Sequence, residues 1–226
     1  MYKYETHCHT LPVSRCAKAS VADTVRFYRE AGYDGLFITN HFLDGNINID
    51  RNAPYEEKIR FYFSDFHEAE AIGREIGIKV FPGVEQTYAG TDFLIYGLDE
   101  DWYLIHPEIM KMDERTKLGF FREAGALVIH AHPFREDSYI DHIRLYPRSV
   151  DGIEIINAGR KEIENLMAEH YAREYGFLVT AGTDNHRAGS APKLAGMASD
   201  IPVNSVGDFI RMVREGSMSL FVENRD

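Results

Sequence analysis

Histidine and acidic residues follow successive apolar runs from one end of this sequence to the other. Imidazole and carboxylate groups together bind Zn²⁺, Mn²⁺ and Fe²⁺ in proteins. The residues that share this position after an apolar run are His7, His9, His41, Glu85, His132, Asp184 and His186. In a parallel α/β barrel the carboxyl ends of the strands converge on one face, where active sites lie. The pattern therefore favours a multinuclear metal-dependent hydrolase.

The spacing within these motifs indicates how ions would be shared. His7 and His9 are two residues apart, so in an extended strand both side chains point to the same face and can bind one ion. Glu85 ends the run Gly83-Val84-Glu85, and the two oxygens of its carboxylate can bridge two ions. Two ions about 3.5–4 Å apart can activate a water and stabilise the oxygens of an in-line phosphoryl displacement.

Apolar, β-branched runs alternate with helical patterns, which is typical of βα units around a parallel sheet. We expect strands over 1–6, 35–39, 78–84, 92–96, 126–130, 152–156, 177–180 and 219–222. We expect helices over 20–31, 55–76, 108–123, 163–175 and 206–214, with irregular structure over 99–107. The favoured architecture is a barrel, distorted or short of eight units. An open doubly wound sheet is the alternative, but it would gather polar residues at one switch point instead of at nearly every strand end.

Composition limits the class of protein. The chain has 226 residues, of which 44% are hydrophobic, and this is enough for one large domain over 1–226. The net charge of −11 makes nucleic acid an unlikely partner, because phosphate backbones reward clustered Lys and Arg. Two cysteines, Cys8 and Cys16, fit a reducing compartment. With no visible signal peptide and no apolar run of roughly 20 residues, we expect a cytoplasmic protein that does not enter a membrane.

The same motifs resemble those of the PHP (polymerase and histidinol phosphatase) superfamily. They occur in the order His-Cys-His-Thr (7–10), Ile-Thr-Asn-His (38–41), Gly-Val-Glu (83–85), Ala-His-Pro-Phe-Arg (131–135) and Gly-Thr-Asp-Asn-His (182–186). The resemblance covers most of the chain. It implies a distorted (β/α)7 TIM-like barrel and hydrolysis of phosphoesters at a site with two or three divalent transition metals, Zn, Mn or Fe.

The resemblance also implies an assignment of ligands. The first metal would bind His7, His9, Glu85 and Asp184; the second would bind Glu85 and His132; the third would bind His41 and His186. The sequence departs from the family pattern in three places. The region 12–16 lacks the usual carboxylate or imidazole, so a third metal would rely on water, substrate or Cys16. Asp92 stands about where a second-metal histidine is usual, and it could substitute as an oxygen ligand. Asn40 replaces an aspartate before His41.

These residues predict a phosphoric ester hydrolase for a small phosphorylated metabolite or nucleotide, acting through a metal-activated hydroxide. Glu85 would bridge the ions, and Asp184 or His186 would protonate the leaving alkoxide. Arg135 follows the His132 motif directly and would bind and stabilise the phosphoryl group, because a guanidinium binds phosphate bidentately. Weaker candidates for substrate contact are Asn157, Arg160 and Arg15.

Two other functions remain open from the sequence. Related metal sites hydrolyse amides and cyclic imides, so an amidohydrolase-like enzyme that cleaves C–N bonds is one alternative. A catalytically degenerate, metal-stabilised binding module is the other. Two nearby residues are expected to be structural: His130 as a hydrogen-bonded core histidine, and Cys8 as a buried inert thiol. No feature of the sequence predicts an oligomeric state.

Overall fold

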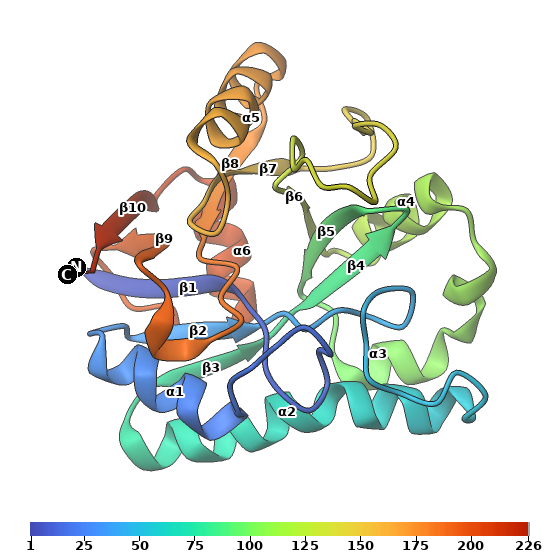
Figure 1. Cartoon of the computed structure of the whole chain (residues 1–226), viewed down its shortest axis with the longest axis horizontal. Coiled ribbons are helices and arrows are strands. Elements are labelled where there is room, and N and C mark those ends of the chain that lie inside the picture. Colours follow the sequence, from blue (N-terminus) through green and yellow to red (C-terminus); the bar gives the residue numbers. More distant parts are fainter. Residues whose placement is uncertain (226) are drawn as a thin grey trace.

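A computed structural model describes residues 1–225 and shows a mixed α/β fold (Figure 1). Within this range the strands are β1 (Tyr2–Cys8), β2 (Gly35–Ile38), β3 (Lys79–Pro82), β4 (Val84–Tyr88), β5 (Thr91–Tyr96), β6 (Leu127–Ala131), β7 (Gly152–Asn157), β8 (Leu178–Gly182), β9 (Lys193–Ser199) and β10 (Ser219–Asn224). The α-helices are α1 (Val21–Glu30), α2 (Tyr55–Ile76), α3 (Glu100–Ile105), α4 (Glu114–Glu123), α5 (Glu162–Tyr175) and α6 (Val206–Arg214). Two short 3-10 helices cover Pro107–Lys111 and Ala188–Ser190.

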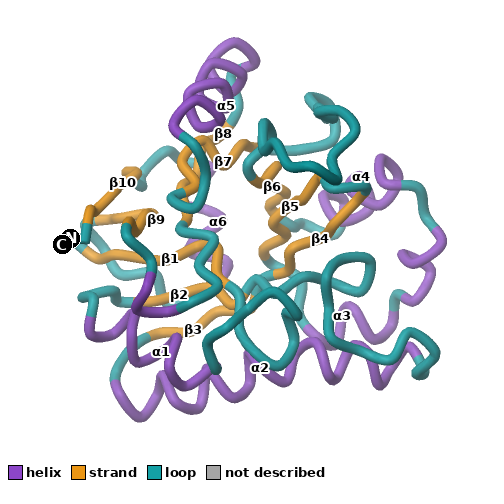
Figure 2. The backbone as a smooth tube through the Cα atoms, viewed as in Figure 1, coloured by secondary structure: helices purple, strands orange, loops and turns teal. Residues whose placement is uncertain are grey.

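The strands of residues 1–225 form two five-stranded sheets, in the orders β10-β9-β1-β2-β3 and β4-β5-β6-β7-β8. Strands β1, β2 and β3 are parallel, as are β6, β7 and β8. Strands β4 and β5 pair antiparallel, and β9 and β10 also run antiparallel to their neighbours. This pairing does not confirm a single closed barrel. Figure 2 shows the strands around a central region, with most helices outside them.

The two sheets meet at the residues of the predicted site. The expected strand over 78–84 is divided into β3 and β4 at Gly83, so Glu85 lies inside β4 instead of at a strand end. An isolated bridge joins His41 to Glu85 across this junction. At the carboxyl end of β1, the backbone N–H of Asp184 donates to the carbonyl of His7 (2.8 Å), which connects β1 to the segment after β8. These contacts hold metal-ligand residue types from both sheets together.

Capping residues explain most helix boundaries. The side chain of Ser20 accepts from the N–H of Asp23 at the start of α1, as expected from the sequence. Asp113 caps α4 in the same way, so the expected helix over 108–123 begins later and follows a short 3-10 helix. Asp99 caps α3, a helix where irregular structure was expected. None of the helices in residues 1–225 combines the length and apolar character needed to cross a bilayer.

Helix α5 packs differently from its sequence pattern. Spacings of three and four in the sequence predict one shared face made of Ile163, Leu166, Met167, His170, Tyr171 and Tyr175. Of this set only Tyr171 is buried, and Ile163, Leu166 and Met167 are 57%, 46% and 42% exposed. The helix therefore packs through Tyr171 together with Ala168 and Ala172, which are also buried.

Candidate metal centre

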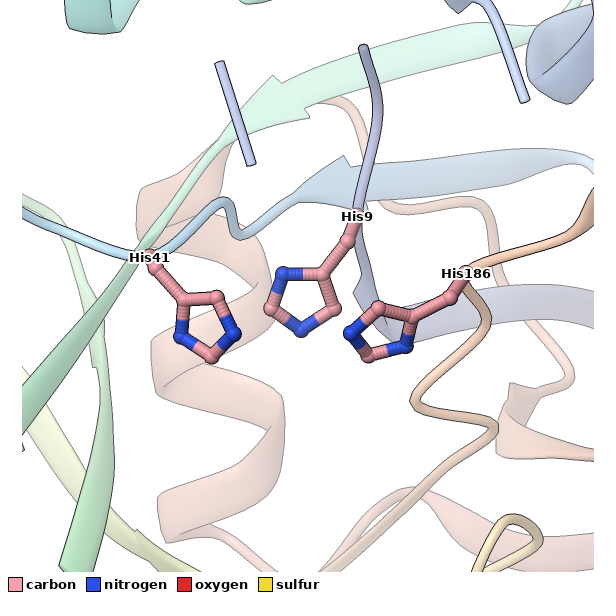
Figure 3. Close-up of side chains that lie close together, drawn as sticks. All are labelled: His9, His41 and His186. Atoms are coloured by element: carbon pink, nitrogen blue, oxygen red, sulfur yellow. The ribbon is translucent and has the colours of Figure 1, made fainter. Parts of the chain in front are cut away.

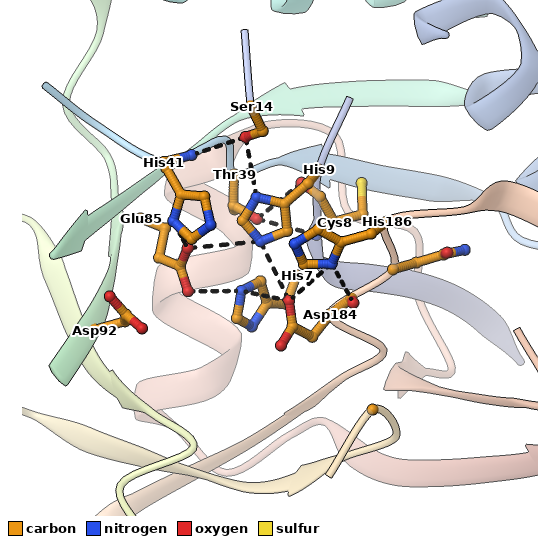
Figure 4. Close-up of polar contacts among 12 residues, drawn as sticks. His7, Cys8, His9, Ser14, Thr39, His41, Glu85, Asp92, Asp184 and His186 are labelled. Carbon is orange, nitrogen blue, oxygen red and sulfur yellow. Dashed lines mark hydrogen bonds and ion pairs between the residues drawn. The ribbon is translucent and has the colours of Figure 1, made fainter. Parts of the chain in front are cut away.

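The strand-end histidines and acids of the sequence converge in one buried cluster (Figure 4). Potential ligand atoms lie within 4.8 Å of one another in four overlapping groups. These groups are His7–His9–Asp184, His7–Glu85–His132, His41–Glu85–Asp92 and His9–His41–His186. Every metal-ligand residue expected from the sequence is therefore present in at least one group. Glu85 belongs to two of them, which fits a bridging carboxylate.

The histidines of β1 are positioned by an irregular strand end. The β1–β2 register shifts between Glu5 and Cys8, directly beside His7. Such irregularities re-aim side chains and are common next to active sites. His7 and His9 converge as predicted, with ring centroids 5.2 Å apart. Cys8 is fully buried, as expected, and donates its thiol proton to the carbonyl of Phe37 (3.2 Å).

Glu154 orients the His7 imidazole. Its Oε1 accepts from His7 Nδ1 at 2.9 Å, and its Oε2 accepts from the N–H of His132 (3.1 Å) and from the amide of Asn157 (2.9 Å). A proton held on Nδ1 leaves the lone pair of His7 Nε2 available for a metal. Nε2 points to the cluster, 3.0 Å from Glu85 Oε1. Glu154 and the neighbouring carboxylates raise the pKa of His7 well above its usual range despite burial, so a bound metal would displace the Nε2 proton and leave the one that faces Glu154.

Ser14 does the same for His9. Its hydroxyl donates to Asn40 Oδ1 (2.7 Å) and so accepts from His9 Nδ1 (3.2 Å). This again leaves Nε2 as the free nitrogen. Asn40 is held by Asp65, whose carboxylate accepts from the Asn40 amide (2.9 Å). The asparagine that replaces the usual aspartate is thus tied to a buried carboxylate from α2.

Several buried polar atoms at the centre lack hydrogen bonds. Within residues 1–225, this holds for His9 Nε2, His132 Nε2 and Glu85 Oε2. His9 Nε2 lies 3.2 Å from Asp184 Oδ1, and His132 Nε2 lies 3.5 Å from Glu85 Oε1, yet neither contact has hydrogen-bond geometry. Unsatisfied buried polar atoms are costly. Imidazole nitrogens and carboxylate oxygens that face one another without hydrogen bonds are potential metal ligands. The residues present therefore suit the divalent metal ions expected from the sequence.

The electrostatics of the cluster favour ionised carboxylates. Burial would raise the pKa of Glu85, but the neighbouring His41, His9 and His7 hold it well below its usual range. The pKa of Asp184 is also held well below normal, against the effect of burial, by His7 and His9. Burial, together with the positive charges of His186 and His41, lowers the pKa of His9 to about 3. Deprotonated carboxylates and a neutral imidazole are the forms that bind metals.

The backbone carries strain at two of these residues. His132 has φ of +29° and Asp184 has φ of +56°, in the region that non-glycine residues rarely occupy. Such conformations cost of order 1–3 kcal/mol and cluster at functional sites. Both residues present side chains to the centre from segments directly after a strand.

A cavity of about 420 Å³ opens over the cluster. It is lined by Glu85, Asp92, Arg135, Arg160, Asp184 and His186, together with Cys16 and His41. Arg135 Nη1 lies 2.9 Å from Asp92 Oδ2, and its Nη2 donates to the carbonyl of Gly90 (2.8 Å). The Asp92 carboxylate therefore faces both the Arg135 guanidinium and the potential metal ligands His41 and Glu85. Volumes of 300–1,000 Å³ are typical of small-molecule sites.

The expected substrate contacts are not all placed alike. Arg135 and Arg160 line the cavity. Asn157 is buried, and its amide donates to Glu154 and to Asp184 Oδ2 (3.4 Å), so it binds the carboxylates around the centre. Arg15 is exposed and does not line the cavity that the described residues form. His130 is buried as expected, but within residues 1–225 neither of its ring nitrogens has a hydrogen-bond partner, so the expected hydrogen bond is wrong.

Glu154 and Ser14 were not identified from the sequence as functional. Glu154 lies inside the apolar run Gly152–Ile156, and a lone acid in a buried strand is a signal that could have been used. Ser14 is one polar residue in a loop, and only the tertiary structure brings it to His9 and Asn40.

Neither a protein-family model nor a curated protein sequence matches this chain. Solved structures share its fold. A two-domain protein from Bacteroides vulgatus, described as containing a PHP-like metal-dependent phosphoesterase, has a TM-score of 0.70 and 14% identity over 97% of this chain. The match covers 64% of that protein, so this chain spans less than two thirds of its length.

Two further structures have a TM-score of 0.55. A protein from Bifidobacterium adolescentis, described as a metal-dependent phosphoesterase, is 13% identical over 93% of this chain and 95% of its own. An amidohydrolase from Chromobacterium violaceum, with bound sulfate and no metal, is 14% identical over 96% of this chain and 97% of its own. The structural neighbours of this chain thus include PHP-like metal-dependent phosphoesterases, and the chain has their fold.

Proposed function

We propose that this protein is a metal-dependent phosphoesterase that hydrolyses a small phosphorylated metabolite or nucleotide. The observation that carries the proposal is the cluster of orphaned imidazole and carboxylate atoms under a cavity with arginine in its wall. The fold of PHP-like phosphoesterases supports it. We further propose that the two sheets correspond to the two halves of the distorted (β/α)7 barrel expected from the sequence.

The residues would bind two ions, with a third held by His41 and His186. The first ion would bind His7, His9, Glu85 and Asp184, and the second would bind Glu85 and His132 with Asp92. Bound Zn²⁺, Mn²⁺ or Fe²⁺ would supply an activated water and would neutralise charge on the phosphoryl oxygens. Glu154 and Ser14 would hold a proton on Nδ1 of His7 and His9, so that Nε2 of each ring faces the ions.

The remaining roles follow from charge. Arg135 and Arg160 give the cavity two guanidinium groups, which would orient the phosphoryl group and exclude water from its other side. Asp184 is ionised because its pKa is held low, so it would be a ligand and not a proton donor. His186, whose pKa is raised by Cys16 and Asp184 despite burial, can hold the proton for the leaving oxygen when two ions are bound.

A C–N bond hydrolase is the second candidate, since an amidohydrolase shares the fold. The two arginines in the cavity favour a phosphoryl substrate. We also propose a cytoplasmic location, because Cys8 and Cys16 are both free thiols, which suits a reducing compartment.

Activity profiles of the metal-loaded protein would separate these functions. We expect hydrolysis of p-nitrophenyl phosphate or a nucleoside monophosphate and no hydrolysis of amide or cyclic imide substrates. Glu85→Gln and Asp184→Asn should each lose most of the metal and most of the rate. The proposal fails if both variants keep full metal content and full hydrolytic rate, or if only C–N bonds are cleaved.

A further inference from the structure

A second cavity lies between α4, the end of α5 and the segment that connects β6 to β7. Its volume of about 460 Å³ is close to the 420 Å³ of the cavity over the metal-ligand cluster. Within residues 1–225, none of the clustered metal-ligand side chains lines it, including His9, His41 and His186, which point toward one another in Figure 3. This is therefore a separate space, of a size typical of small-molecule sites.

The second cavity and the metal centre lie on opposite faces of β5. Asp92 belongs to the metal-ligand cluster, and Phe93, the next residue of the strand, therefore points to the other face. The Tyr146 ring, which lines the second cavity, packs edge-to-face against Phe93 with ring centroids 5.2 Å apart. A ligand in this cavity would thus contact the back of a strand that carries the metal centre, without reaching the metal ligands.

The charge of the second cavity is opposite to that of the whole chain. The chain has 36 acidic and 25 basic residues, yet the cavity lining includes Arg115, Arg122 and Arg148 and no carboxylate. The Arg122 guanidinium is held from behind by Asp151, whose carboxylate accepts from its Nε (2.8 Å). Within residues 1–225, Arg115 and Arg148 have no ion-pair partner, so their charges are available to an anion.

The remaining lining is apolar and leaves room for a ligand body. Gly119 lies inside α4, where glycine weakens a helix, and an added Cβ would have no heavy atom within 4 Å. Leu145 and Tyr175 supply apolar and aromatic surface, and Ser149, which is 6% exposed, supplies a hydroxyl. The second cavity therefore combines guanidinium groups with apolar walls.

We propose that this cavity binds a small organic anion, in which a phosphate or carboxylate group is attached to an apolar, ring-bearing body. Arg115 and Arg148 would contact the anionic group, because guanidinium groups match the oxygens of phosphate and carboxylate bidentately. The ring would pack on Tyr146 and on the surface left open by Gly119. The proposal concerns a site apart from the metal centre and does not depend on the proposed function.

Isothermal titration calorimetry with benzenesulfonate tests this proposal on the metal-loaded protein. The probe carries a tetrahedral anionic group on an aromatic ring, and its sulfonate is a weak ligand for transition metals. We expect the wild type to bind benzenesulfonate more tightly than inorganic sulfate, which lacks the ring. Arg115→Gln and Arg148→Gln should each weaken binding at least about 10-fold, because each variant loses a hydrogen bond to a charged group.

Gly119→Leu tests the same site without removing a charge. The leucine side chain would occupy the space that the ring needs, and leucine favours a helix over glycine, so we expect a folded protein that does not bind the probe. Arg135→Gln is the matched control, because it removes an arginine from the cavity over the metal centre and should leave the affinity unchanged.

Three results would overturn the proposal. They are no binding to the wild type, wild-type affinity in Gly119→Leu and both arginine variants of the second cavity, and an equal loss of affinity in Arg135→Gln. Sulfate that binds as tightly as benzenesulfonate would overturn the assignment of an organic ligand. None of these results would count against the phosphoesterase proposal, because the second cavity contains no metal-ligand residue of the cluster.

Discussion

The hydrogen bond between Glu154 and His7 allows a sharp test of how the centre is organised. In the wild type, the Glu154 carboxylate accepts three hydrogen bonds, from His7 Nδ1, from the His132 N–H and from the Asn157 amide. Glu154→Gln preserves size but provides only one acceptor oxygen. If that oxygen serves His132 and Asn157, the introduced NH₂ group faces His7 Nδ1.

His7 must then accept at Nδ1 and carry its proton on Nε2, the nitrogen that would bind metal. The opposite orientation of the amide restores the His7 contact but leaves the buried N–H of His132 facing another donor, at a cost of about 1–3 kcal/mol. Loss of such an orienting carboxylate typically lowers metal affinity about 10- to 100-fold. We therefore expect the affinity to fall by roughly 1.4–2.8 kcal/mol.

Competition with a chromophoric chelator for Zn²⁺ measures this loss directly. Glu5→Gln is the matched control. Glu5 lies on β1, is fully buried like Glu154, and accepts a hydrogen bond from the backbone N–H of His7 (2.8 Å) instead of from its imidazole. Burial raises the pKa of Glu5 to about 7, so removing its charge costs little near neutral pH. Unchanged affinity in Glu154→Gln, or an equal loss in both variants, would refute the tautomer argument.

Three further predictions concern the cavity and α4. Arg135→Lys should lower kcat/KM for a phosphomonoester about 10- to 100-fold, the equivalent of roughly 1.4–2.8 kcal/mol, because lysine cannot make the bidentate contact. Steady-state kinetics at unchanged metal content test this, and an equal kcat/KM would exclude phosphate binding by Arg135. Burial raises the pKa of Glu114 from 4.5 to about 7, despite Lys117 nearby. The folded state therefore binds more protons between these values, and stability falls as pH rises from about 4.5 to about 7. In denaturant unfolding, Glu114→Gln should be more stable than the wild type at pH 8, by on the order of 3 kcal/mol, and should show no gain near pH 4. A difference in stability that does not change with pH would contradict the raised pKa of Glu114. Gly119 lies inside α4 with open space around an added Cβ, so Gly119→Ala should stabilise the protein by about 0.5–1 kcal/mol, and a lower melting temperature would contradict that view.

The metal-ligand residues could be predicted from the sequence because they combine two local features, an imidazole or carboxylate side chain and a position at the end of an apolar run. His7, His9, His132 and Asp184 each lie at or just after the end of a strand, and all reach the cluster. The expected helices over 55–76 and 206–214 are present as α2 and α6. Caps and αL glycines such as Gly77 explain why these boundaries can be predicted.

Strand direction and long-range partners could not be predicted in the same way. Strand β5 is buried along its whole length, and a buried strand has the same sequence pattern whether it pairs parallel or antiparallel. The break at Gly83 between β3 and β4 leaves no signal in hydrophobic periodicity. The partners of Glu154 lie on β1 and after β6, so its role depends on tertiary packing.

Metal content per chain is the most direct test of the central claim. We would measure it by plasma mass spectrometry on protein purified without a chelator or a histidine tag. The account predicts two or three equivalents of transition metal, with most of it lost in His7→Ala and Glu85→Gln. Metal content near zero that added Zn²⁺, Mn²⁺ or Fe²⁺ does not restore would contradict the account.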